Sequence, residues 1–200
     1  YMGHMRFEDT QPYEPWFWKK NRIELIQDFV QQVKVKEKAL ELKGGKQVPF
    51  DKLVIACGSK PNKFGWPGQD LRGVQGLYHF QDLQSMEENT KECRHAVIVG
   101  GGLIGIEMAE MLASRGISVT FLVREKNFWS NVLPKDESVL IEKHILEHHI
   151  DLRLGSELKE ILDDGTGKVT KVITSEGEQI ECQFVGLTAG AVSYTHLRAH

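Results

Sequence analysis

The stretch AVIVGGGLIGIEMAE, residues 96–110, is the most informative part of the sequence for the fold. It begins with an apolar run from Ala96 to Val99, continues with three successive glycines and passes into residues with helical spacing. Glycine loses more conformational freedom on folding than any other residue, so a glycine triplet is costly unless something approaches the backbone closely. The stretch therefore raises the question of what lies against this turn, a bound ligand or only a neighbouring part of the chain.

The glycines follow the pattern GxGxxG. Gly100, Gly102 and Gly105 lie directly after a predicted strand and open a predicted helix, the context in which the pattern indicates a dinucleotide site. Gly100 allows the tight turn, Gly102 lets backbone N–H groups reach a pyrophosphate, and Gly105 lets the helix pack close to the strand. The helix N-terminus at Leu103 and Ile104 adds partial positive charge for phosphates. The alternative is that the glycines serve packing alone.

The sequence around the motif predicts alternating strands and helices. Gln81 to Glu92 has the spacing of a surface helix. After the motif we expect a helix that stops at Gly116, a strand at 118–123, a helix at 136–149, a strand at 151–154, short strands near 158–162, 169–174 and 179–183, and a last strand at 184–189. Asp136 or Ser138 is the expected N-cap of the second helix. This order predicts a dinucleotide-binding α/β domain with a three-stranded meander.

The region before this domain reads differently. Residues 1–20 are rich in aromatics and show no period, so they predict a loop-rich segment. Three elements are expected after them: a strand at 22–26, a hairpin over 31–48 that turns at Gly44 and Gly45, and a buried strand from Leu53 to Ala56 that ends in Gly58. We therefore expect a small antiparallel sheet followed by a buried strand.

Bulk composition excludes several classes of function. The chain has 200 residues, 40% of them hydrophobic and 26% charged, which is typical of a globular protein. A net charge of −3 is too small to indicate a nucleic-acid or acidic-membrane partner. No apolar run approaches the about 20 residues of a membrane span. Cys57, Cys93 and Cys182 are scattered, which argues against a disulfide scaffold or a metal site and favours a cytoplasmic location.

The end of the strand at 118–123 bears on the choice of dinucleotide. An acidic residue at this place, roughly 20 residues after the glycines, would bind the adenosine ribose hydroxyls. Here the position is Val123, and Arg124 follows it. Without the carboxylate a 2′-phosphate is not repelled, and an arginine can bind one, so the pattern favours NADPH over NADH. Glu125 leaves NADH open, because its carboxylate is close enough in sequence to take a ribose.

Two stretches together resemble the pyridine nucleotide-disulfide oxidoreductases, a family of flavoprotein reductases. One is VIVGGGLIGIEMAE, residues 97–110, and the other is FDKLVIACGSKPNKFGWPGQDLRGV, residues 50–74. The resemblance covers about residues 22–190. It implies an α/β, Rossmann-like three-layer fold for FAD and NAD(P), incomplete at both ends. The stretches MGHMRFED and PWFWKKNR hint at a nitrite-reductase-like or ferredoxin-reductase-like branch.

The resemblance also implies a division of the chain. Residues 1–80 correspond to the C-terminal part of a split FAD-binding domain, and residues 81–191 to an inserted NAD(P)-binding domain. The family's first glycine motif, which holds FAD, has no counterpart in this sequence. Residues 192–200 depart from the family and look like a non-native tail, so we exclude them from fold reasoning. We therefore expect a fragment that binds FAD poorly by itself.

Several site residues follow from the resemblance alone. Ala56, Cys57 and Gly58 match the strand end that the family places at the flavin. Cys57 stands where the family has threonine, and we interpret it as a small buried residue in preference to a redox thiol.

Further positions concern the nicotinamide side. Glu107 matches a carboxylate that lies near the nicotinamide ring in the family, or it is a surface glutamate that favours the helix dipole. Leu103 stands where some relatives carry a tyrosine over the flavin. Gly190, after Ala189, matches a glycine that contacts the cofactor.

The implied activity is that of an FAD-dependent NAD(P)H oxidoreductase. Hydride would pass from the nicotinamide to the flavin, and electrons from the flavin to an unidentified acceptor, either a small molecule or a redox protein. No catalytic side chain is assigned, and a homodimer of the whole protein stays open. The alternative is a non-catalytic dinucleotide-binding module that acts as a redox sensor or scaffold.

Overall fold

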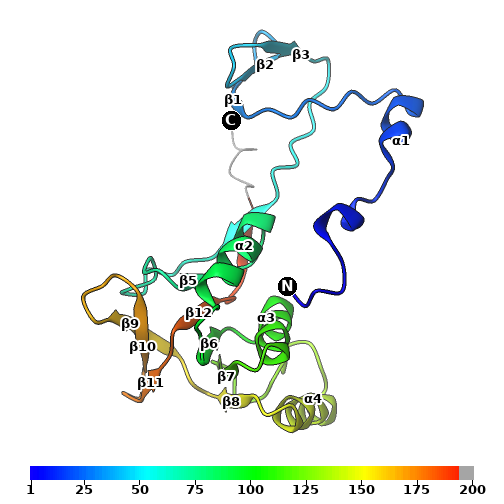
Figure 1. The fold of residues 1–200 in the computed structure, drawn as a ribbon. Coiled ribbons are helices and arrows are strands. Elements are labelled where there is room, and N and C mark those ends of the chain that lie inside the picture. Colours follow the sequence, from blue (N-terminus) through cyan, green and yellow to red (C-terminus); the bar gives the residue numbers. More distant parts are fainter. Residues whose placement is uncertain (194–200) are drawn as a thin grey trace. The chain divides into compact units, whose positions relative to one another are not determined.

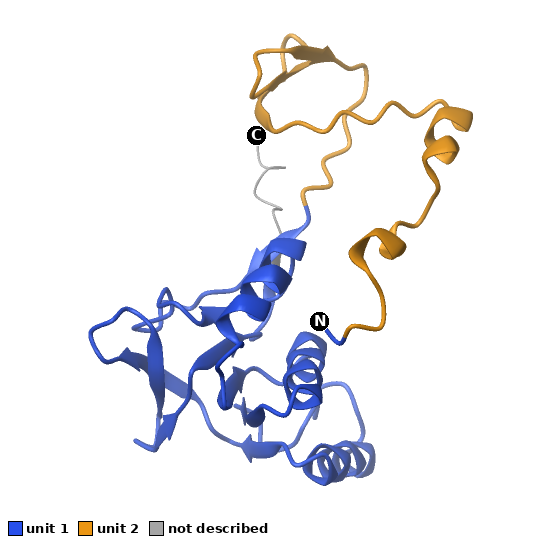
Figure 2. Cartoon of the chain, in the orientation of Figure 1, with its two compact units in different colours: residues 1–2, 58–200 blue, residues 3–57 orange. Residues whose placement is uncertain are grey.

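The computed structural model describes residues 1–193 and divides them into two compact units. Unit 1 comprises residues 1–2 and 58–193, and unit 2 comprises residues 3–57 (Figure 2). The boundary of the compact units therefore falls after residue 57. The division at residue 80 concerns cofactor-binding domains, which compactness does not test, so it stays a prediction.

Unit 1 is built on a five-stranded sheet in the order β5-β12-β6-β7-β8 (Figure 1). Every pairing in this sheet is parallel. The strands are β5 (Val74–Gln75), β12 (Phe184–Leu187), β6 (His95–Val99), β7 (Ser118–Val123) and β8 (Asp151–Leu154). The α/β fold predicted from the sequence is confirmed.

The side chains of strand β6 show that unit 1 has three layers, with the sheet between the helices and the meander. Ala96 and Ile98 belong to a core cluster with residues of the helices, and Val97 and Val99 belong to a second cluster with residues of the meander. Successive side chains of a strand point to opposite faces of the sheet, so both faces are covered. The helices are α2 (Phe80–Asn89), α3 (Leu103–Ser114) and α4 (Lys135–Glu147).

The predicted caps of these helices were right for α3 and wrong for α4. Helix α3 ends at Ser114 with Arg115 as its C-cap, and Gly116 follows with a φ of +74°, the left-handed conformation that glycine adopts easily. Helix α4 has Pro134 at its N-cap, so Asp136 and Ser138 lie inside the helix. The extended backbone of Pro134 (φ −55°, ψ 154°) lets the helix begin directly after it, ahead of both candidate caps.

The meander is a three-stranded antiparallel sheet in the order β11-β10-β9. Its strands are β9 (Leu158–Asp163), β10 (Val169–Thr174) and β11 (Gln179–Glu181), as the alternating pattern predicted. A further antiparallel pair joins β4 (Ser59–Pro61) to β13 (Ala191–Ser193). Residues 194–200 of the expected non-native tail lie outside the described residues, and that expectation stays a prediction.

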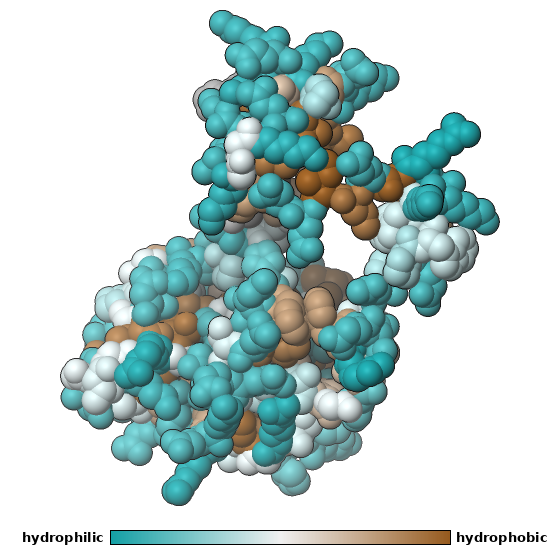
Figure 3. Space-filling model, turned by 45° about the horizontal axis from the view of Figure 1, so that its top comes forward, coloured by the Kyte–Doolittle hydropathy of each residue, from teal (hydrophilic) through white to brown (hydrophobic). Residues whose placement is uncertain are grey.

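Unit 2 contains a small antiparallel sheet in the order β1-β2-β3. Its elements are η1 (Phe7–Thr10), α1 (Pro15–Lys20), β1 (Val30–Lys34), β2 (Ala39–Leu42) and β3 (Gln47–Pro49). The predicted hairpin is confirmed, with Gly45 at a φ of +80°. The strand predicted at 22–26 is wrong. Hydrophobic side chains lie at the surface of this unit, among them Leu25 and Phe29 with 64% and 68% exposed (Figure 3).

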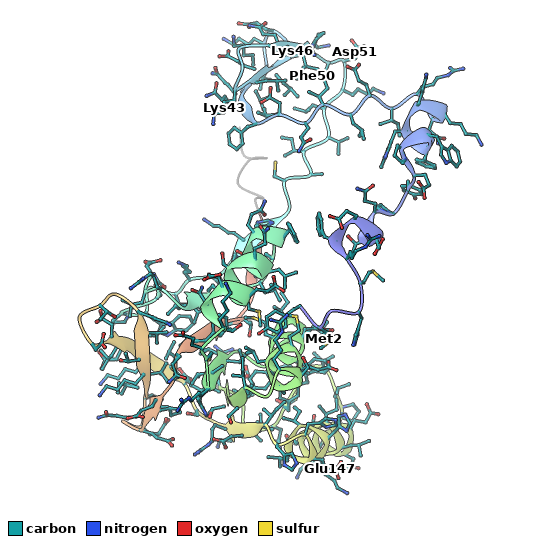
Figure 4. The ribbon with its side chains drawn as sticks, viewed as in Figure 1. Met2, Lys43, Lys46, Phe50, Asp51 and Glu147 are labelled. Atoms are coloured by element: carbon teal, nitrogen blue, oxygen red, sulfur yellow. The ribbon has the colours of Figure 1, made fainter. Side chains whose placement is uncertain are left out.

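The buried strand predicted from Leu53 to Ala56 is also wrong. The segment follows Phe50 and Asp51 as a chain without regular structure (Figure 4). Val54 is 88% exposed, and Cys57, expected to be buried, is exposed. An apolar strand is buried only when neighbouring strands pair with it and other elements cover it, and no strand within residues 1–193 pairs with this segment.

Candidate functional site

A cavity of about 960 Å³ lies in unit 1 at the carboxyl ends of β6, β7 and β12. Strand β6 lies between β7, which follows it along the chain, and β12, which comes last. Ligands of open parallel sheets bind where the strand order reverses in this way. The cavity is lined by the turn at 100–104, the strand end at 122–125, residues 129–132, 156–158 and 188–191, and Phe64, Trp66 and Tyr78.

Two of the motif glycines are required by the chain itself. A Cβ on Gly100, whose φ is +108°, would lie 2.6 Å from the Ala189 nitrogen. A Cβ on Gly105 would lie 2.4 Å from the Gly100 oxygen and 2.9 Å from Cζ of Phe121. These distances are too short for real contacts. Gly100 and Gly105 therefore allow the turn, the end of β12 and helix α3 to approach one another.

Gly102 is different, because nothing in the chain excludes a side chain there. The nearest atom to a Cβ on Gly102 would be the Thr188 oxygen at 3.8 Å. Its φ of −89° and ψ of 177° suit any residue. Gly102 is also the N-cap of α3 and supplies no side-chain cap to the first-turn N–H groups. The open space and the uncapped N–H groups fit a phosphate-bearing ligand that approaches the backbone.

Thr188, at the end of β12, holds the turn in place. Its hydroxyl oxygen lies 3.0 Å from the Val99 oxygen and 2.8 Å from the Gly100 oxygen, and the residue is 4% exposed. Sequence reasoning missed Thr188, although it directly precedes Ala189 and Gly190 at the end of a predicted strand. The hydroxyl joins strands that are far apart in the sequence, so it fixes the edge of the cavity.

Val123 and Arg124, the residues predicted to distinguish NADPH from NADH, line the cavity. Val123 is 1% exposed, and its Cγ1 would lie 3.0 Å from a Cβ on Gly101. The Arg124 side chain is 72% exposed, and its Nη2 donates to Oε1 of Glu125 at 3.1 Å. An exposed pair of this kind contributes about 0–1 kcal/mol, so the guanidinium can leave it at little cost.

Two aromatic residues that sequence reasoning missed border the same cavity. The Trp129 indole Nε1 donates a hydrogen bond to the Gly101 carbonyl. The Tyr78 hydroxyl donates to the Gly190 carbonyl at 3.1 Å, and burial raises the pKa of Tyr78 above its ordinary value. Tyr78 therefore stays a neutral donor at physiological pH. The only signal for Trp129 in the sequence was an aromatic residue in the loop that follows the predicted strand at 118–123.

The remaining predicted residues divide into two groups. Leu103, Ile104 and Gly190 line the cavity, whereas Glu107 is exposed and is not among the residues that line it. The predicted flavin contacts are not among the lining residues either: Ala56 and Cys57 belong to unit 2, and Gly58 begins the main segment of unit 1.

Two further properties concern residues 1–193. Within this range, no cluster of three or more His, Cys, Asp or Glu side chains is arranged to hold a metal ion. Across the same residues, no helix combines the length and the apolar character that a membrane crossing requires.

Known proteins resemble this chain. The family described as pyridine nucleotide-disulphide oxidoreductase matches residues 14–200. An NADH oxidase of Enterococcus faecalis is 30% identical over 82% of this chain and 36% of its own length. A CoA-dependent NAD(P)H sulfur oxidoreductase of Pyrococcus abyssi is 35% identical over 86% of this chain and 39% of its own.

A solved structure agrees with these relatives. An FAD-dependent pyridine nucleotide-disulphide oxidoreductase from Desulfovibrio vulgaris superimposes with a TM-score of 0.75 and 27% identity, over 88% of this chain and 46% of that one. The chain therefore spans less than half the length of each protein named here.

Proposed function

Because the chain belongs to the pyridine nucleotide-disulphide oxidoreductase family, we propose that it is the nicotinamide-binding part of an FAD-dependent NAD(P)H oxidoreductase. The Enterococcus faecalis relative is an NADH oxidase, the Pyrococcus abyssi relative is an NAD(P)H oxidoreductase, and the Desulfovibrio vulgaris structure is FAD-dependent. The observation that carries the proposal is the space at Gly102, where neither backbone conformation nor a neighbouring atom demands glycine. The cavity at the switch point of the parallel sheet supports it.

The residues of unit 1 divide the binding of the dinucleotide among them. The first-turn N–H groups of α3 hold the pyrophosphate, and Thr188 keeps the glycine turn in shape. The side chains of Leu103 and Ile104 and the backbone of Gly190 bound the space for the rest of the molecule. When bound, the reduced nicotinamide supplies a hydride for the flavin, from which electrons reach an acceptor that is a small molecule or a redox protein.

Arg124 determines which of the two dinucleotides, NADPH or NADH, binds more tightly. Val123 offers no carboxylate to the ribose hydroxyls, and Arg124 exchanges its exposed pair with Glu125 for a 2′-phosphate. The proposal is therefore a preference for NADPH over NADH.

The flavin contacts at Ala56, Cys57 and Gly58 form a separate part of the proposal. They need partner strands that the described residues do not provide. Glu107 stays outside the proposed nicotinamide contacts, because it is exposed and does not line the cavity.

The first experiment is titration calorimetry of the full chain and its Gly102→Ala variant with NADPH and NADH. We expect wild type to bind, and Gly102→Ala to lose at least about tenfold in affinity, equivalent to about 1.4 kcal/mol. Its thermal stability should hardly change, since the nearest atom lies 3.8 Å from the new Cβ. Gly44→Ala is the matched control, because its Cβ also has its nearest atom at 3.8 Å, Oδ2 of Asp28.

The second experiment tests the preference. Arg124→Ala should weaken NADPH binding about tenfold, the effect of losing one charged hydrogen bond, and leave NADH binding unchanged. Arg6→Ala, in unit 2, is the control. If wild type binds neither dinucleotide, the proposed function is wrong. Absence of flavin reduction by either dinucleotide in the holoenzyme would favour the scaffold alternative.

A further inference from the structure

The hydrogen bond between the Trp129 indole and the Gly101 carbonyl has a consequence for the glycine turn. We propose that Trp129 is a positioning residue, which fixes the orientation of the Gly101–Gly102 peptide and thereby the direction of the Gly102 N–H. The proposal rests on the proposed function, because the N–H is aimed at the pyrophosphate of a dinucleotide.

The geometry of the peptide unit supplies the first step. Peptide bonds are planar, and no peptide bond within residues 1–193 is cis. In a trans peptide the C=O of one residue and the N–H of the next point in opposite directions. The Gly101 carbonyl is held by Trp129, so the Gly102 N–H points away from the indole. Both glycines line the cavity.

The sequence supplies the second step. Gly100, Gly101 and Gly102 have no Cβ atoms to restrict rotation about their backbone bonds, so this peptide could turn over at low cost. A flipped peptide would present a carbonyl oxygen where the N–H had been, and its partial negative charge would repel a phosphate. A donor held on the carbonyl removes this alternative.

Trp129 is itself held firmly enough for this task. Its φ of +54° is uncommon for a bulky residue, and its carbonyl accepts hydrogen bonds from the N–H groups of Val132 at 2.8 Å and Leu133 at 2.9 Å. The preceding Phe128 is fully buried, and its ring centroid lies 5.8 Å from that of Phe121. The backbone N–H of Phe128 donates to Oε1 of Glu142 at 2.7 Å. Helix α4 and strand β7 therefore anchor the residue before the indole.

The same contacts connect two functions of the cavity wall. The segment that begins with Arg124 and contains Trp129 leaves β7 and reaches back to the glycine turn that follows β6. Arg124, which is proposed to bind the 2′-phosphate, and Trp129, which holds the glycine turn, therefore belong to one anchored segment. Trp129 acts through Gly102 and needs no contact of its own with the reacting atoms.

The first test measures the ¹³C chemical shift of the Gly101 carbonyl by NMR in the full chain without ligand, because a carbonyl that accepts a hydrogen bond is deshielded. Trp129→Phe keeps an aromatic ring but removes the N–H, and we expect the Gly101 carbonyl resonance to move upfield. Trp129→His, which keeps a ring N–H, should restore part of the shift. Trp16→Phe, in unit 2, is the control and should change nothing. An unchanged Gly101 carbonyl shift in folded Trp129→Phe would overturn the proposal.

The second test compares ADP with adenosine as probes in titration calorimetry. Only ADP carries a pyrophosphate, so Trp129→Phe should weaken ADP binding about fivefold or more and alter adenosine binding less than twofold. Equal losses for both probes would mean a merely structural role and would overturn the proposal. If wild type binds neither probe, the proposed function fails, and the chemical shift of the Gly101 carbonyl still decides whether Trp129 holds the peptide.

Discussion

Two segments of the chain have the same kind of sequence and opposite fates. Residues 53–58, LVIACG, and residues 95–100, HAVIVG, are both apolar runs that end in glycine. Ile98 is fully buried in β6, whereas Ile55 is 40% exposed and has no strand around it. An apolar run thus predicts a tendency, and only its neighbours turn that tendency into a strand.

The two segments differ in whether a strand is available to pair with them. Strand β6 is joined to β7 through one helix, a local unit that closes easily, and β12 then pairs with its other edge. For residues 53–58 the described chain offers no pairing strand and no covering layer.

The largest difference should appear in thiol reactivity. Burial raises the pKa of Cys182 to about 12, and the thiol of Cys93 adds to the shift. A thiol with that pKa is only about 10⁻⁴ ionised at pH 8, and the thiolate is the reactive form. We expect iodoacetamide to modify the exposed Cys57 at least about 10³ times faster than Cys182, as measured by peptide mass spectrometry.

The pH dependence of this labelling has a defined sign. Between pH 8 and 10, still below its pKa, Cys182 should react about tenfold faster for each unit of pH, because its thiolate fraction rises by that factor. Similar rates for Cys57 and Cys182 at pH 8 would mean that the two regions are equally open.

Matched isoleucine truncations measure the packing directly. Ile98→Ala should destabilise unit 1 by about 3 kcal/mol, because it leaves a cavity between the sheet and α3. Ile55→Ala should change the free energy of unfolding by less than about 0.5 kcal/mol. Urea unfolding followed by near-UV circular dichroism gives both values, and equal effects of the two changes would refute the contrast.

The glycines that end the two runs provide a finer comparison. Both have positive φ, +108° for Gly100 and +72° for Gly58, so alanine is strained at either position. Only at Gly100 would the Cβ meet another atom, the Ala189 nitrogen at 2.6 Å. We expect losses of about 3 kcal/mol for Gly100→Ala and about 1 kcal/mol for Gly58→Ala in thermal unfolding. A larger loss at Gly58 would show that residues 53–58 are packed.

The smallest effect concerns a defect within the packed unit. Among the described residues, the hydroxyl of Ser138 in α4 is buried without a hydrogen-bond partner. Ser138→Ala should raise the free energy of unfolding by about 1 kcal/mol, since it removes a desolvated polar group and alanine favours the helix. Ser114→Ala is the control, because the Ser114 hydroxyl is exposed and donates to the Met111 carbonyl at 2.7 Å. A loss of stability in Ser138→Ala would reveal a hidden partner.

The site shows where sequence reasoning succeeds and where it ends. Gly100, Gly102, Val123 and Arg124 line the cavity, and the sequence indicated them because each lies at a fixed offset from a strand that the local pattern predicts. Thr188 and Trp129 were missed because their partners are distant: Thr188 bonds to Gly100, 88 residues away, and Trp129 to Gly101, 28 residues away. No local period records such a contact.

The alternation of strands and helices in unit 1 can be derived from the sequence alone, since hydrophobic periodicity and glycine stops act within one or two turns of chain. The sequence also determined that a glycine turn meets a helix N-terminus. The different roles of the glycines follow only from the folded structure: Gly100 and Gly105 allow the close approach of the end of β12 and the ring of Phe121, whereas Gly102 leaves space open. The reason is that a close approach depends on atoms that folding brings together from distant parts of the chain.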